Sequence, residues 1–163
     1  MPAQPLVTAV ASYSSRSAAS RDLDAVRQAR AARELPDVAM AMLGKGADGQ
    51  LTIEAHDDPA EHLPRGGALL GGLLVVIATP VGIRFLVPMM RTHTDWTRVS
   101  VIAGHFWHDI PRAQLHRMSD LLEAGQAALV VVAAGPDGAT IGACLANAGD
   151  TLVTDGIWAD LDA

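Results

Sequence analysis

An uncharged apolar segment in the middle of the chain limits how the rest of the sequence can fold. Residues 66–83 read GGALLGGLLVVIATPVGI without a charged side chain, and Arg84 follows directly. A membrane-spanning helix needs about 20 apolar residues, so the segment is at the lower limit for one span and too short for a two-span hairpin. One span would also separate the strands predicted before and after it, although one sheet needs both. We therefore expect an insertion within one folded domain.

Three interpretations of this insertion, residues 57–106 with the apolar part at 66–90, remain open. It is a helical segment buried in the protein's own core, a self-association element, or a re-entrant or interfacial contact with a membrane surface. An apolar face lined with glycines favours self-association, because a second copy can cover it and small residues four apart let helices approach closely. The interfacial interpretation lacks the basic polar face that such helices usually carry. The residues expected to form an oligomer contact are Gly67, Leu70, Gly71, Leu74 and Ala78.

The rest of the chain alternates between strand-like and helix-like patterns. Short runs rich in apolar and β-branched residues predict strands at 6–13, 37–43, 50–56 and 127–134. Apolar residues spaced three and four apart predict helices at 14–35 and 111–124. The run 127–134, AALVVVAA, is apolar throughout, as in an interior strand that is buried on both faces. A short helix at 140–148 and an edge strand at 151–154 are predicted to follow.

Apart from the insertion, the predicted order is β-α-β-β-α-β with a small α-β extension. This order is typical of the ferredoxin-like split βαβ arrangement, in which two helices cover one face of an antiparallel sheet. We therefore expect an α+β fold and a single domain over residues 1–163. The insertion would lie between the third strand and the second helix.

Composition restricts the classes of function. The 163 residues suffice for one ordinary domain, and a net charge of −6 opposes nucleic-acid binding. Cys144 is the only cysteine, which excludes a disulfide or a thiolate zinc cluster within one chain and fits a reducing cytoplasm. No basic region precedes the apolar run 6–11, so we expect no secretory signal.

The sequence GHFWHDIP contains the densest group of side chains that could bind a metal. In a helix, His105, His108 and Asp109 would share one face, and imidazole with carboxylate can hold zinc or iron. The spacing matches no specific metalloenzyme motif, and histidines that cap a helix start explain it more simply. We therefore predict no cofactor and keep the metal site as an alternative. A further ligand would come from His56, Asp57 or His62.

Two other features have weak functional interpretations. The serine-rich run YSSRS at 13–17 follows a predicted strand and opens a helix, where backbone N–H groups can hold an anion. It contains no glycine, so a serine N-cap is the simpler explanation. Cys144 lies in an alanine-rich predicted helix and is expected to be a small core residue. No nucleophile, base and orienting group are spaced as a catalytic set, so we predict no catalytic residue.

Three stretches together resemble the bacterial DUF1269 family. They are VTAVASYSSRSAASRDLDAVRQAR, the apolar GGALLGGLLVV after LPR, and GHFWHDIPRAQLHRMSDLLEAGQAALVVVAA. The resemblance implies a stress-related protein associated with membranes, and it implies no active-site residue. We expect a non-enzymatic, cytoplasmic homo-oligomer with a stress-related or scaffolding role that assembles through the insertion. The alternatives are a metal-binding protein or small metal-dependent enzyme, and a membrane-associated protein that inserts residues 66–90.

Overall fold

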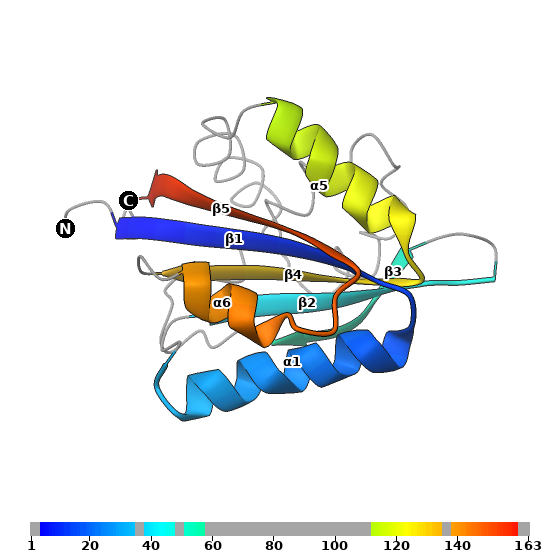
Figure 1. Cartoon of the computed structure of the whole chain (residues 1–163), viewed down its shortest axis with the longest axis horizontal. Helices are drawn as coiled ribbons and strands as arrows, with labels where there is room; N and C mark the ends of the chain where they lie inside the picture. Colours follow the sequence, from blue (N-terminus) through cyan, green and yellow to red (C-terminus); the bar gives the residue numbers. More distant parts are fainter. Residues whose placement is uncertain (1–3, 35–37, 48–50, 58–111, 135–137, 160–163) are drawn as a thin grey trace, which may run out of the picture.

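The described residues form an α+β fold in which three helices pack against one five-stranded antiparallel sheet (Figure 1). The structure is a computed structural model that describes residues 4–34, 38–47, 51–57, 112–134 and 138–159. The strands are β1 (Gln4–Tyr13), β2 (Val38–Lys45), β3 (Leu51–Asp57), β4 (Ala127–Ala134) and β5 (Asp150–Ala159). The helices are α1 (Arg16–Ala31), α5 (Arg112–Ala124) and α6 (Gly138–Cys144). All eight predicted elements are present, although the helix predicted at 140–148 begins at Gly138 and ends at Cys144.

The strand order is β3-β2-β4-β1-β5, and each neighbouring pair is antiparallel. Because β1 and β2 both run antiparallel to β4, they are parallel to each other, and α1 connects them across β4. In the same way β4 and β5 are parallel with β1 between them, and α6 connects them. The chain therefore contains two interleaved βαβ crossovers, with β1 and β4 at the centre of the sheet.

Helices α1 and α6 cover one face of the sheet. Alternate residues along each strand point to this face, where they form one buried cluster with the apolar sides of both helices. Its strand members include Val7, Ala9, Tyr13, Met40, Leu129 and Val131, and its helix members are Ala19, Leu23, Val26, Ala29 and Ile141. This cluster is the main core that the described residues show.

Helix α5 lies against β1, β4 and β5 on the opposite face (Figure 1). The strand residues that point this way, such as Val10 and Val132, are also fully buried, and Met118 and Leu122 of α5 are buried with them. The prediction that helix 111–124 shares a face with helix 14–35 is therefore wrong. Because β4 is apolar on both faces, both need cover, and the spacing within a helix does not say which face it takes.

The C-terminal strand is longer than predicted. Instead of four residues at 151–154, β5 has 10 residues and pairs with β1 from Gln4↔Ala159 to Ser12↔Asp150. A register shift between Leu6 and Thr8 interrupts the pairing. The predicted extension is thus an integral strand of the sheet.

The insertion at 57–106 lies outside the described residues apart from Asp57, and so do Gly67, Leu70, Gly71, Leu74 and Ala78. Strands β3 and β4, which precede and follow it in the sequence, lie in one sheet as expected. Among the residues that are described, no helix combines the length and the apolar character needed to cross a bilayer.

Candidate functional site

A buried polar network lies where β1 leads into α1. The Tyr13 hydroxyl donates a hydrogen bond to Asp22 Oδ2 at 2.8 Å. The Asn147 side-chain amide donates to Asp22 Oδ1 at 2.7 Å, and the Asn147 backbone N–H donates to Oδ2 at 3.0 Å. Asp22 is 1% exposed, so these donors replace the water that its carboxylate loses on folding. The network fastens α1 to the turn that joins α6 and β5.

Tyr13 has a shifted pKa because of this environment. Burial of the phenol raises its pKa first of all, and the hydrogen bond and negative charge of Asp22 raise it further. The phenol therefore stays protonated at neutral pH and is held as a hydrogen-bond donor. Its geometry suits a structural bond better than acid–base chemistry.

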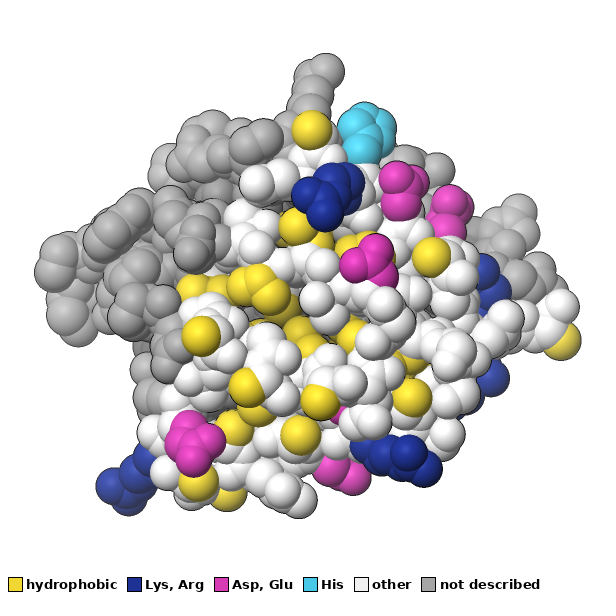
Figure 2. Space-filling view, in the orientation of Figure 1, with side chains coloured by type: hydrophobic (Ala, Val, Ile, Leu, Met, Phe, Trp, Pro, Cys, Tyr) yellow, Lys and Arg dark blue, Asp and Glu magenta, His cyan; other side chains and the backbone are white. Residues whose placement is uncertain are grey.

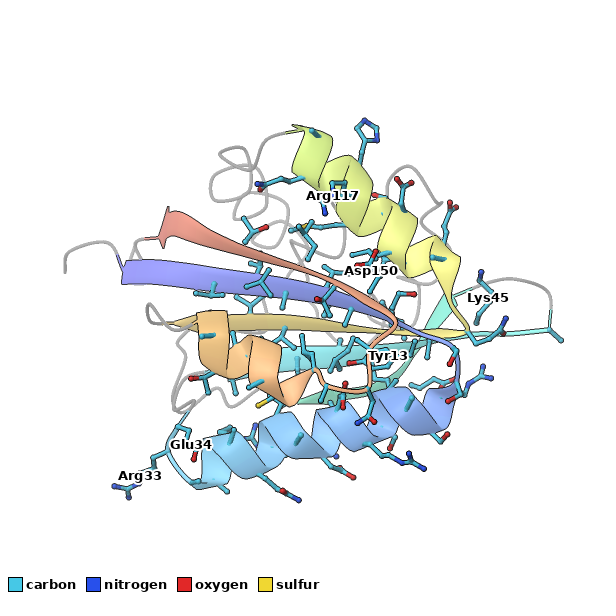
Figure 3. All side chains as sticks on the ribbon, in the orientation of Figure 1. Tyr13, Arg33, Glu34, Lys45, Arg117 and Asp150 are labelled. Atoms are coloured by element: carbon cyan, nitrogen blue, oxygen red, sulfur yellow. The ribbon has the colours of Figure 1, made fainter. Side chains whose placement is uncertain are left out.

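A second group of contacts joins α1 to the β2–β3 hairpin at the same end of the sheet, near Tyr13 and Lys45 in Figure 3. Arg16 Nε donates to Glu54 Oε1 at 2.6 Å, and Arg16 Nη2 donates to the Lys45 carbonyl at 2.7 Å. Lys45 Nζ donates to the Glu123 carbonyl at the end of α5, also at 2.7 Å. A Cβ at Gly44 would collide with the Glu54 carboxylate, so glycine leaves the space in which this ion pair lies.

The serine-rich run at 13–17 forms an ordinary helix start. Ser15 is the N-cap of α1, and its side-chain oxygen accepts a hydrogen bond from the Ala18 N–H at 3.2 Å. The Arg16 guanidinium, which could have added positive charge for an anion, is directed to Glu54 and the hairpin. The capping interpretation of this run is confirmed by these contacts.

Cys144 lies on the last turn of α6 and is partly buried. Its pKa is raised by burial and then by the charges of Glu34 and Asp22. Because the thiolate is the nucleophilic form, the raised pKa makes this thiol a weak nucleophile. Cys144 packs at the margin of the main core, close to its predicted position.

The predicted metal cluster of His105, His108 and Asp109 lies outside the described residues, as does His62. His56 and Asp57 lie in β3, and for these two residues the structure describes the backbone. Within the described ranges, no three His, Cys, Asp or Glu side chains are grouped as a metal site would require. The metal cluster stays a prediction.

One surface feature was not singled out from the sequence. The exposed residues of α6 carry no charge, and neither do Thr151 and Val153 of β5, whereas Asp150 at the start of β5 is an exposed acidic side chain beside them (Figures 2 and 3). Charged side chains of α1 and α5 lie farther out around this set. Val153, 37% exposed, is the one large hydrophobic side chain that is exposed among the described residues. We call this set the α6–β5 surface: Ala139, Gly142, Ala143, Ala146, Asn147, Thr151 and Val153. The signal in the sequence is the lack of any charged residue from 138 to 149.

Comparisons with protein-family models, with curated proteins and with solved structures found no match for this chain. The contacts and surfaces described above are therefore the observations on which a functional proposal rests. They comprise two polar clusters that hold the fold together and one uncharged surface.

Proposed function

We propose that this protein is a non-enzymatic α+β domain of the ferredoxin-like type that acts by associating with copies of itself. The two interleaved crossovers support the ferredoxin-like topology, with β4 and α6 as its third strand and second helix. Strand β3 would then be an added edge strand, and α5 a helix added on the opposite face. The polar groups at the sheet end support a non-enzymatic role, because Arg16, Lys45 and Asp22 each bond to another element of the fold.

The observation that carries the proposal is the α6–β5 surface. Two chains that each carry a net charge of −6 repel one another, so they meet most favourably where neither presents charge. Interface centres are depleted of charged residues and surrounded by a polar rim, and the α6–β5 surface has Asp150 at its edge and charged side chains of α1 and α5 beyond it (Figure 2). A two-fold contact also needs a patch that is compatible with itself, and an uncharged patch of small side chains meets that need.

The uncharged segment 66–83 gives a second reason to propose self-association. A run of 18 residues without charge predicts an apolar surface that either the protein itself or another copy would cover. We propose that Gly67, Leu70, Gly71, Leu74 and Ala78 contribute to assembly together with the α6–β5 surface. A cytoplasmic scaffolding or stress-related role, with contact to a membrane surface, follows from the resemblance noted in the sequence.

The test is the molar mass of the purified full-length chain, measured in detergent-free buffer by light scattering at micromolar concentrations. We expect an oligomer in the unaltered protein and a shift toward monomer in the double variant Ala143→Glu/Val153→Glu. Ser20→Glu/Gln28→Glu, on the exposed side of α1, adds the same charge as the matched control and should leave the mass unchanged. A stable monomer in the unaltered protein over this concentration range contradicts the proposal.

A second pair of variants tells which surface is used. Leu70→Glu/Leu74→Glu introduces the same charge into the insertion, with circular dichroism as the check on folding. Dissociation by this pair alone assigns assembly to the insertion, and dissociation by the first pair alone assigns it to the α6–β5 surface. If neither pair changes the mass, neither surface is the interface.

The alternative function is metal binding by His105, His108 and Asp109. Imidazole and carboxylate ligands in this arrangement would predict about one zinc or iron per chain in elemental analysis, and loss of that metal in His105→Ala/His108→Ala. Substoichiometric metal, with a melting temperature that does not change after chelation, would rule out this alternative.

A further inference from the structure

The two faces of the sheet are held by different kinds of contact. Beneath α1 the contacts are apolar and are reinforced by the Asp22 network, with donor–acceptor distances of 2.7 to 3.0 Å. Beneath α5 the buried strand residues include the hydroxyl groups of Thr8, Ser12 and Thr154. Helix α5 adds the buried Ser119 to the same contact. The contact under α5 therefore combines apolar side chains with several buried hydroxyl groups and has no counterpart of the Asp22 network among the described residues.

Thr8 is the weak point of that contact. Thr8 is fully buried, and its side-chain Oγ1 has no hydrogen-bond partner. Thr8 lies directly opposite Thr154 in the β1–β5 pairing, so both side chains point to the face that α5 covers. The Thr154 hydroxyl reaches Gln114 of α5 at 3.5 Å, the outer limit of a hydrogen bond.

A buried hydroxyl without a partner destabilises only the closed arrangement. When α5 lifts away, water can hydrate Thr8, and the penalty disappears. Lifting α1 would instead cost free energy, because it would break the three hydrogen bonds that Asp22 accepts. It would also separate α1 from the α6–β5 turn. Release of α5 would break the exposed hydrogen bond from Lys45 to the Glu123 carbonyl and expose Met118 and Leu122, but among the described residues it would break no buried hydrogen bond to a carboxylate. The two helices therefore differ in how readily each separates from the sheet.

We infer that α5 is a releasable lid, which leaves the sheet while α1, α6 and the five strands stay folded. Its release uncovers a strip of β1 and β5 on which the hydroxyls of Thr8, Ser12 and Thr154 alternate with Val10 and Leu152. All five of these residues are buried in the closed fold. Sub-global openings of this kind are cooperative units of structure with their own free energy.

Hydrogen–deuterium exchange on the intact chain tests the inference. Peptides from α5 should exchange at least about tenfold faster than peptides from α1, after correction for intrinsic rates. Thr8→Val removes the unpartnered hydroxyl at nearly constant shape, so it should slow α5 exchange by about tenfold. Thr154→Val, the matched control, removes a hydroxyl that has a partner and should not slow α5.

A third variant separates release of α5 from unfolding of the whole protein. Leu23→Ala weakens the core under α1, so it should speed α1 exchange and leave α5 exchange unchanged if α5 opens independently. Equal protection of α1 and α5 in the unaltered protein overturns the inference, and so does unchanged α5 exchange in Thr8→Val. The comparison of α1 with α5 exchange in the unaltered protein tests the inference even if a variant fails to fold.

Discussion

At the scale of single residues, Tyr13 joins the sheet, α1 and the α6–β5 turn through one hydrogen bond to a buried carboxylate. Its pKa is raised in the folded protein, so the folded state holds the phenolic proton more tightly than the unfolded chain does. The resulting stabilisation is complete below the ordinary tyrosine pKa of about 10 and is lost as the pH rises above it. We therefore predict that the free energy of unfolding falls at alkaline pH and that ionisation of Tyr13 contributes to this fall.

Tyr13→Phe should lower the free energy of unfolding at neutral pH by about 1–2 kcal/mol, because Asp22 loses one of its donors. The same variant should remove the Tyr13 part of the fall in stability above pH 10. Urea unfolding across the pH range measures both effects, and Tyr13 is the only tyrosine, so phenolate absorbance reports it alone. Cys144→Ala is the control, since it removes the other group with a raised pKa and should leave the Tyr13 effect in place. An alkaline profile that Tyr13→Phe does not alter would contradict this account of the network.

We expect a glycine-to-alanine substitution to have opposite effects on stability at Gly125 and at Gly142. A Cβ at Gly125 would collide with the Tyr13 carbonyl oxygen and lie 2.7 Å from Ser12 Oγ, whereas a Cβ at Gly142 has nothing within 4 Å. Gly125→Ala should destabilise the protein by about 2–3 kcal/mol through overpacking. Gly142→Ala, within α6, should stabilise it by about 0.5–1 kcal/mol through helix propensity. Thermal unfolding measures both variants, and an unchanged or raised melting temperature in Gly125→Ala would contradict the close approach of Tyr13 and Ser12 to Gly125.

At the scale of elements, the end of α1 carries a local strain. Arg33 has a φ of 61°, in the left-handed region, and the Glu34 N–H donates to the Ala29 carbonyl at 2.9 Å. This is the Schellman geometry, in which glycine is the favoured residue at the position that Arg33 occupies.

Arg33→Gly should therefore raise the free energy of unfolding by about 0.5–1 kcal/mol. Arg21→Gly, exposed in the middle of α1, is the matched control and should lower it by about 1 kcal/mol. Denaturant unfolding of both variants gives the comparison. A loss of stability in Arg33→Gly would mean that the Arg33 side chain contributes more than its backbone strain costs.

The elements themselves were predictable from local patterns, and their arrangement was less so. The apolar run 127–134 and the capped pattern at 111–124 locate β4 and α5 within a residue or two. The face that α5 takes depends on contacts across the sheet, which the spacing within the helix does not encode. The length of β5 was underestimated because Asp155 and Gly156 are unfavourable in strands, although pairing with β1 continues past them.

The polar clusters were predictable only in part. The serine N-cap follows from the residue types that open a helix, and the structure contains it. The bond between Asp22 and Asn147 joins residues 125 positions apart, and no local pattern indicates such a pair. The α6–β5 surface likewise emerges only when α6 and β5 are placed side by side.

At the scale of the whole molecule, charge governs the proposed self-association. Copies with a net charge of −6 that meet through an uncharged surface repel at long range, and salt screens that repulsion. The dissociation constant should therefore fall several-fold between about 20 mM and 500 mM NaCl. Sedimentation equilibrium at the two salt concentrations measures it, with the Ala143→Glu/Val153→Glu variant as the control. A dissociation constant that rises with salt would indicate an interface built on ion pairs.

The position of β1 in the sheet also has a consequence for biosynthesis. Both neighbours of this first strand, β4 and β5, come from the last quarter of the chain. While the ribosome is still translating, the nascent amino-terminal half has no partner for β1 and cannot complete the sheet. The sheet can then be completed only after β4 and β5 have been translated, and the delay leaves apolar strands open to chaperones in the meantime.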